Sequence, residues 1–171
     1  SNAFAAAILV GTNDIGLASG GSCGGVDLNV TISNIDSMAS QYASRGIIPI
    51  LITIPARDAP CVSRKDDLNN KIRDLANSRG YILLDASQFY STSDLRDDRH
   101  LKDKGKKIAD SLAELFKNLS SACGVQLNVN SSGGTSSTGS TGFSSSSGSI
   151  ACGKELANKT TDAYSLEKGA Q

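Results

Sequence analysis

The sequence predicts an α/β protein built on a parallel β-sheet. Three short apolar runs, Ala5 to Val10, Ile47 to Ile54 and Tyr81 to Leu84, alternate with longer amphipathic stretches, which is typical of β-α-β units. None of these runs alternates strictly between apolar and polar residues. Such runs are expected for strands that helices cover on both faces.

Three helices are expected around these strands. Their apolar residues recur at helical spacing, and glycines near the predicted ends favour helix boundaries. The marking positions are Leu28, Ile32, Ile35, Met38, Ala39 and Tyr42 in the first helix, Leu68, Ile72, Leu75 and Ala76 in the second, and Ile108, Leu112, Leu115 and Phe116 in the third. The second stops at Gly80, and the third is entered through Asp103-Lys104-Gly105.

Composition narrows the classes of function. The 171 residues carry 17 basic and 17 acidic side chains, a formal net charge of zero, which argues against a nucleic-acid partner because phosphate neutralisation needs a basic surface. No run approaches the roughly 20 apolar residues of a membrane-spanning helix. The sequence contains no motif that predicts a cofactor or a metal ion.

The chain divides into unequal parts. Residues 1–3, Ser-Asn-Ala, are typical of the scar that a cleaved expression tag leaves, and residues 4–120 hold the α/β pattern. Between 131 and 149 every residue except Phe143 is Gly, Ser or Thr, so we expect a loop or linker over 121–152, because this composition buries too little apolar surface to offset its ordering entropy. Residues 153–171 form a polar tail with the potential for one short helix.

Four cysteines favour disulfides over a metal site, because none of them has Cys-x-x-Cys spacing. Three pairings are open, and chain order favours Cys23 with Cys61 and Cys123 with Cys152. Disulfides indicate an oxidising compartment, so we expect a secreted, extracellular or periplasmic protein. The alternative is four unpaired buried thiols.

Three polar segments follow the three predicted strands. They are Gly11 to Asp14, Arg57 to Ser63 and Asp85 to His100. In an open α/β sheet, ligands bind outside the carboxyl ends of the strands, where such segments converge. We therefore expect Asn13 and His100, the sole histidine, to lie on one rim of the sheet.

The residue types on this rim suit acyl transfer. A side-chain amide at a strand end can donate a hydrogen bond to a developing oxyanion, and Asn13 is the candidate. A histidine can act as general base toward a hydroxyl if a carboxylate fixes its tautomer. His100 and Asp97 are the candidates, with Asp98 or Asp94 as alternative carboxylates.

Each element also has a structural interpretation. Gly11 to Asp14 can be a simple turn, His100 a solvated surface residue, and Asp103 a helix cap. The joint position of the Asn and the His at strand ends favours the functional interpretation.

These residues resemble two sequence blocks of the SGNH or GDSL-type serine hydrolases, which are esterases and lipases. The run Ile8-Leu9-Val10-Gly11-Thr12-Asn13-Asp14-Ile15 is similar to the family's third block, and Asp97-Asp98-Arg99-His100-Leu101 to its fifth. The resemblance covers about residues 5–119. It implies a three-layer flavodoxin-like fold, with Asn13 as an oxyanion-hole donor and with Asp97 and His100 as triad members.

The blocks that carry the nucleophile are missing. In the family, a serine in a Gly-Asp-Ser context and a later glycine both precede the third block, which here begins at the N-terminus. Ser165-Leu166-Glu167-Lys168-Gly169 superficially resembles part of the first block. However, 154–164 contains no apolar run to form a preceding strand, and six residues after Ser165 are too few for the helix that should follow.

The resemblance therefore predicts the C-terminal portion of a secreted esterase or lipase that cleaves acyl or acetyl esters of a carbohydrate or lipid, with its serine outside these residues. On its own, this chain is expected to be inactive. The edge of the Ala5 to Val10 strand should be open, and would pair with a complementing N-terminal half or with a second copy. The alternative is a secreted binding or surface module on the same scaffold.

Overall fold

A computed structural model shows the predicted α/β architecture. It describes residues 3–16, 23, 25–57, 61–97 and 99–123. Three strands, β1 (Ala5–Ile8), β2 (Ile48–Ile52) and β3 (Ile82–Leu84), form one parallel sheet in the order β1-β2-β3. The predicted 121–152 loop and the 153–171 tail lie almost entirely outside the described residues.

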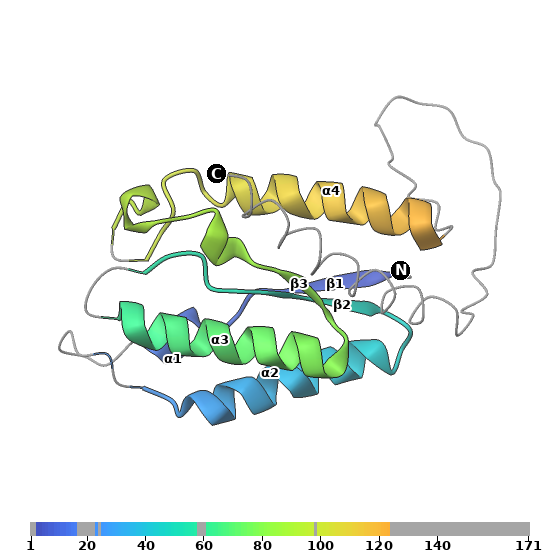
Figure 1. Cartoon of the computed structure of the whole chain (residues 1–171), viewed down its shortest axis with the longest axis horizontal. Coiled ribbons are helices and arrows are strands. Elements are labelled where there is room, and N and C mark those ends of the chain that lie inside the picture. Colours follow the sequence, from blue (N-terminus) through green and yellow to red (C-terminus); the bar gives the residue numbers. More distant parts are fainter. Residues whose placement is uncertain (1–2, 17–22, 24, 58–60, 98, 124–171) are drawn as a thin grey trace, which may run out of the picture.

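Helices cover both faces of this sheet. Helices α2 (Leu28–Ala43) and α3 (Val62–Arg79) pack on one face, and α4 (Lys106–Cys123) packs on the other, so that three layers result (Figure 1). A single helical turn, α1 (Thr12–Ile15), follows β1 directly, where the sequence predicts only a turn. Among the described helices, none is both long enough and apolar enough to cross a membrane.

The two cores explain why β2 is apolar throughout. Ile48, Ile50 and Ile52 pack in the cluster that includes Ile108 and Leu119 of α4. In the other cluster, strand residues, including Leu51 of β2, pack against α2 and α3. The fully buried members of this cluster include Ile15, Leu51, Leu68 and Ile72. Each face of β2 therefore needs apolar side chains, because β2 is the central strand of the three.

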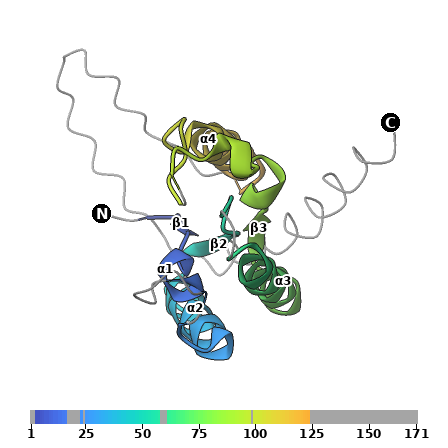
Figure 2. The same cartoon turned by 90° about the vertical axis from the view of Figure 1, so that its left-hand side faces the viewer.

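The carboxyl ends of the three strands share one end of the molecule. This end is on the left of Figure 1 and faces the viewer in Figure 2. Helix α1, the segment before α3, and the segment with the short 3-10 helices η1 (Ala86–Gln88) and η2 (Thr92–Asp94) all lie there. The topology thus brings together the three polar segments that follow the strands.

The strand β1 is shorter than its apolar run. It ends at Ile8, opposite Leu51 of β2, because the chain then bends toward Gly11, whose φ of 101° lies in the left-handed region. The side chains of Leu9 and Val10 are 41% and 37% exposed. Within the described residues, β1 pairs with β2 alone, so its outer edge is open, as expected.

Candidate functional site

Helix α1 places Asn13 at the carboxyl end of β1. The backbone N–H groups of Asp14 and Ile15 donate to the carbonyl of Gly11, at 3.1 and 3.2 Å, and this closes the turn. A Cβ at Gly11 would lie 2.8 Å from Cδ2 of Leu68, so glycine is required by contact as well as by φ. The side chain of Asn13 is exposed.

Asp14, the residue after Asn13, has a structural role. Its carboxylate accepts a hydrogen bond from the buried hydroxyl of Thr31 on α2, at 2.9 Å. This bond fixes α1 against α2, and leaves Asn13 as the side chain of the turn that faces solvent.

Asp97 and His100 form a close pair in the loop before α4. Nδ1 of His100 lies 2.9 and 2.8 Å from the two carboxylate oxygens of Asp97. The backbone N–H groups of Arg99 and His100 donate to the same carboxylate, at 3.0 and 2.9 Å. The carboxylate therefore accepts from the backbone and the ring of one short loop.

This geometry favours an ionised Asp97. The hydrogen bond from the backbone N–H of Arg99, followed by those from the ring and backbone of His100, holds the pKa of Asp97 well below its ordinary value. An ionised carboxylate at Nδ1 selects the imidazole tautomer that leaves Nε2 as a hydrogen-bond acceptor. Among the described residues, none hydrogen bonds to Nε2, and the His100 side chain is 61% exposed.

Asp94, an alternative carboxylate, is engaged elsewhere in the described part of the chain. Asp94 accepts from the backbone N–H and the hydroxyl of Ser91, at 2.8 and 3.0 Å, in a capping box at η2. Asp98 lies outside the described residues. Asp97 is thus the carboxylate that the structure places at the ring.

The loop that carries this pair is anchored at its base. Leu95 and Leu101 form an antiparallel bridge, and the backbone N–H of Lys102 donates to the carbonyl of Asp94, at 2.8 Å. The Nζ of Lys107, in the first turn of α4, lies 3.3 Å from the Asp94 carboxylate. Backbone pairing therefore sets the position of Asp97 and His100, although both side chains are exposed.

A polar cluster joins the ends of β2 and β3 beneath this rim. Arg73 of α3 binds both oxygens of Asp85, at 2.9 and 3.1 Å, and the hydroxyls of Ser87 and Thr53 donate to the same carboxylate, at 2.6 and 2.8 Å. Burial raises the pKa of Asp85, but these hydrogen bonds and the Arg73 charge outweigh it and lower the pKa to about 2. The cluster is internally paired and has a structural role.

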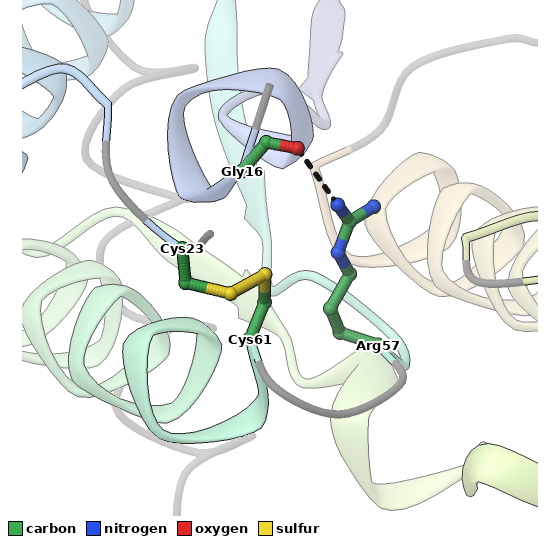
Figure 3. Close-up of a disulfide and its surroundings, with 4 residues drawn as sticks. All are labelled: Gly16, Cys23, Arg57 and Cys61. Atoms are coloured by element: carbon green, nitrogen blue, oxygen red, sulfur yellow. Dashed lines mark hydrogen bonds between the residues drawn. A yellow bond between two sulfur atoms is a disulfide. The ribbon is translucent and has the colours of Figure 1, made fainter. Parts of the chain in front are cut away.

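Arg57 and a disulfide lie between the segments that follow β1 and β2 (Figure 3). Cys23 and Cys61, which are 38 positions apart in the chain, form the disulfide that chain order favours. The other expected pairing, Cys123 with Cys152, includes a residue outside the described part of the chain. The guanidinium of Arg57 donates from Nη2 to the carbonyl of Gly16, at 2.9 Å.

The structure thus places the candidate residues as follows. Helix α1, which carries Asn13, and the loop before α4, which carries Asp97 and His100, lie at the same end of the sheet in both views (Figures 1 and 2). Ser165 lies outside the described residues. Within the part of the chain that the structure describes, no three His, Cys, Asp or Glu side chains are grouped so as to hold a metal ion.

Sequence reasoning assigned no role to two residues near this rim. Arg57 is 4% exposed, although it lies in a polar segment that follows β2. Asn69 is fully buried on α3 and binds both backbone groups of Ile54, at 2.8 and 2.9 Å. The spacing of Asn69 with Ile72 and Ala76 places it on the apolar face of the helix, which is the signal in the sequence.

Comparison with known proteins supports the fold. No protein-family model matches the sequence, and no curated protein matches it. A solved structure that is similar is a GDSL-like lipase from Bacteroides thetaiotaomicron, with a TM-score of 0.54 and 21% sequence identity. The chain shares the fold of this GDSL-like lipase. The match covers 67% of this chain and 62% of the lipase chain, so this chain spans under two thirds of that protein's length.

Proposed function

We propose that this chain is the part of a secreted ester hydrolase that carries the general base and an oxyanion donor. The observation that carries the proposal is the pairing of Nδ1 of His100 with the Asp97 carboxylate, at 2.8 Å, which leaves Nε2 without a partner among the described residues. The likeness to a GDSL-like lipase, the position of Asn13 at the same end of the sheet and the Cys23–Cys61 disulfide support it.

The proposed mechanism assigns one task to each residue. Nε2 of His100 accepts the proton of a serine hydroxyl as the oxygen attacks the ester carbonyl, and later returns it to the leaving alcohol. Asp97 holds the ring and stabilises the imidazolium. The side-chain amide of Asn13 donates a hydrogen bond to the oxyanion of the tetrahedral intermediate. The substrates are acyl or acetyl esters of a carbohydrate or lipid.

The serine is proposed to reside in polypeptide outside these 171 residues. A complementing segment that adds a strand along the open edge of β1 would bring it to the same end of the sheet. The exposed Leu9 and Val10, which follow β1 in the chain, support this docking site. Self-association through this edge is the competing arrangement, and a monodisperse monomer of the 171-residue chain in light scattering would contradict it.

A test of the proposal is hydrolysis of a short-chain nitrophenyl ester by the protein at its natural length. His100→Ala should lower kcat/KM about 10²- to 10⁴-fold, the usual contribution of general base catalysis. Asp97→Asn should also lower it, whereas Asp74→Asn, at an exposed position on α3, is the matched control and should not. Undiminished turnover in His100→Ala contradicts the assignment.

Labelling by a fluorophosphonate probe separates the enzyme from the binding module. The natural-length protein should be labelled at a serine that precedes Phe4, in a Gly-Asp-Ser context. Labelling of the 171-residue chain at Ser165 would instead identify the alternative nucleophile. Failure to label either form would favour a non-catalytic binding or surface module.

A further inference from the structure

Arg57 carries a buried charge that the described part of the chain pairs only in part. Its side chain is 4% exposed and follows β2 at the carboxyl ends of the strands. Nη2 donates to the carbonyl of Gly16, at 2.9 Å, but Nη1 is buried and has no hydrogen-bond partner. Among the described carboxylates, none forms an ion pair with this guanidinium.

This arrangement is unfavourable unless another group completes it. Arginine stays protonated in proteins, so the buried guanidinium is a full positive charge. Buried charges are normally paired, and a buried donor without an acceptor destabilises the folded state. The hydrogen bond to Gly16 explains why Nη2 lies at the end of α1. It does not explain why Nη1 is buried without a partner.

The position of Arg57 points to a ligand at the sheet rim. Figure 3 shows Nη2 turned toward Gly16, and the other terminal nitrogen pointing away from the Cys23–Cys61 disulfide. Gly16 is the C-cap residue of α1, so the hydrogen bond from Arg57 links its guanidinium to the helical turn that carries Asn13. A group bound at Nη1 would therefore lie next to the element that holds the proposed oxyanion donor.

We propose that Arg57 binds an anionic oxygen group of a ligand, either a carboxylate or a phosphate. Nη1 offers two N–H donors, and charge-assisted hydrogen bonds from guanidinium to such oxygens are among the strongest in proteins. The inference that this ligand is the substrate rests on the proposed function. If it is, the substrate is a negatively charged ester. Anion binding itself requires no serine and no turnover.

Anion titration of the 171-residue chain tests this site. Acetate and inorganic phosphate are titrated separately at constant ionic strength, with chloride as the balancing salt, and the amide NMR signal of Gly16 and the thermal midpoint are followed. At least one anion should produce a saturable change in both, and the two arms identify whether carboxylate or phosphate is preferred.

Four variants decide the origin of the response. Arg57→Met should abolish it and Arg57→Lys should weaken it, because lysine lacks the planar fork. Arg45→Met, which removes an exposed arginine, is the matched control and should keep it. His100→Ala should also keep it, so that loss of ester hydrolysis and loss of anion binding are distinguishable.

The same response in Arg57→Met as in the unchanged protein would overturn the proposal, because the anions would then bind elsewhere. If Arg57→Met does not fold, the unchanged protein decides, and an unsaturable or absent shift of the Gly16 signal with both anions overturns the proposal.

Discussion

The Asp85 carboxylate should contribute stability that depends on pH. Hydrogen bonds from Arg73, Ser87 and Thr53 lower its pKa from 3.8 to about 2, despite the opposing effect of burial. At 1.36 kcal/mol per pH unit, this difference corresponds to roughly 2.4 kcal/mol. The side chain is 23% exposed, and solvent screening reduces the expected contribution to about 1–2 kcal/mol.

The sign of the effect follows from linkage. Because the pKa is lower in the folded than in the unfolded chain, the contribution is complete above about pH 4 and is lost as the pH falls toward 2. Asp85→Asn should therefore lower the free energy of unfolding by about 1–2 kcal/mol at pH 7, and this deficit should shrink toward pH 2. Urea unfolding followed by circular dichroism at a series of pH values measures it.

The control for this experiment is Asp74→Asn. Asp74 is exposed on the same helix as Arg73, and its replacement should leave the free energy of unfolding nearly unchanged at every pH. A deficit in Asp85→Asn that is equally large at pH 7 and at pH 2.5 would refute the reasoning, because the loss would then come from packing and not from charge.

Two further predictions concern the segments around the rim. Gly11→Ala should lower the free energy of unfolding by about 2–4 kcal/mol, since the new Cβ would meet Leu68 at 2.8 Å and φ at this position is 101°. Gly46→Ala is the control and should lower it by only about 1–2 kcal/mol, because φ there is 77° but the new Cβ would lie in open space. Equal losses for the two variants in urea unfolding would contradict this prediction. Replacing both Cys23 and Cys61 by serine should lower the free energy of unfolding by up to about 4 kcal/mol, because the two cysteines are 38 positions apart in the chain. An unchanged urea midpoint would show that the bond does not constrain the unfolded chain.

Much of the fold is predictable from the sequence, because its strongest signals are periodic. The apolar run around Ile50 is a buried central strand, and the stripe from Leu68 to Ala76 is the buried face of α3, as expected. The predicted boundaries of the helices were less accurate where the residues are polar. Helix α3 begins at Val62, six residues before Leu68, and the sequence does not mark this start, because none of residues 62–67 is buried and they carry no apolar periodicity.

The site was predictable as a set of segments, and less so as a set of contacts. Topology alone places Asn13 and His100 at one end of a parallel sheet, and three-residue spacing suggests that Asp97 reaches His100. The burial of Arg57 was not predictable, because it depends on the approach of Gly16, which is 41 residues away in the chain. Contacts between loops of different strands leave no pattern in the local sequence.

The account rests on Asp97 preparing His100 to accept a proton at Nε2, and NMR of the imidazole nitrogens tests this directly. His100 is the sole histidine, so its ring signals need no assignment, and the measurement requires no serine. At a pH where the ring is neutral, the account predicts that the proton resides on Nδ1, and that Asp97→Asn shifts it toward Nε2. A neutral ring with its proton mainly on Nε2 in the unchanged protein would contradict the account.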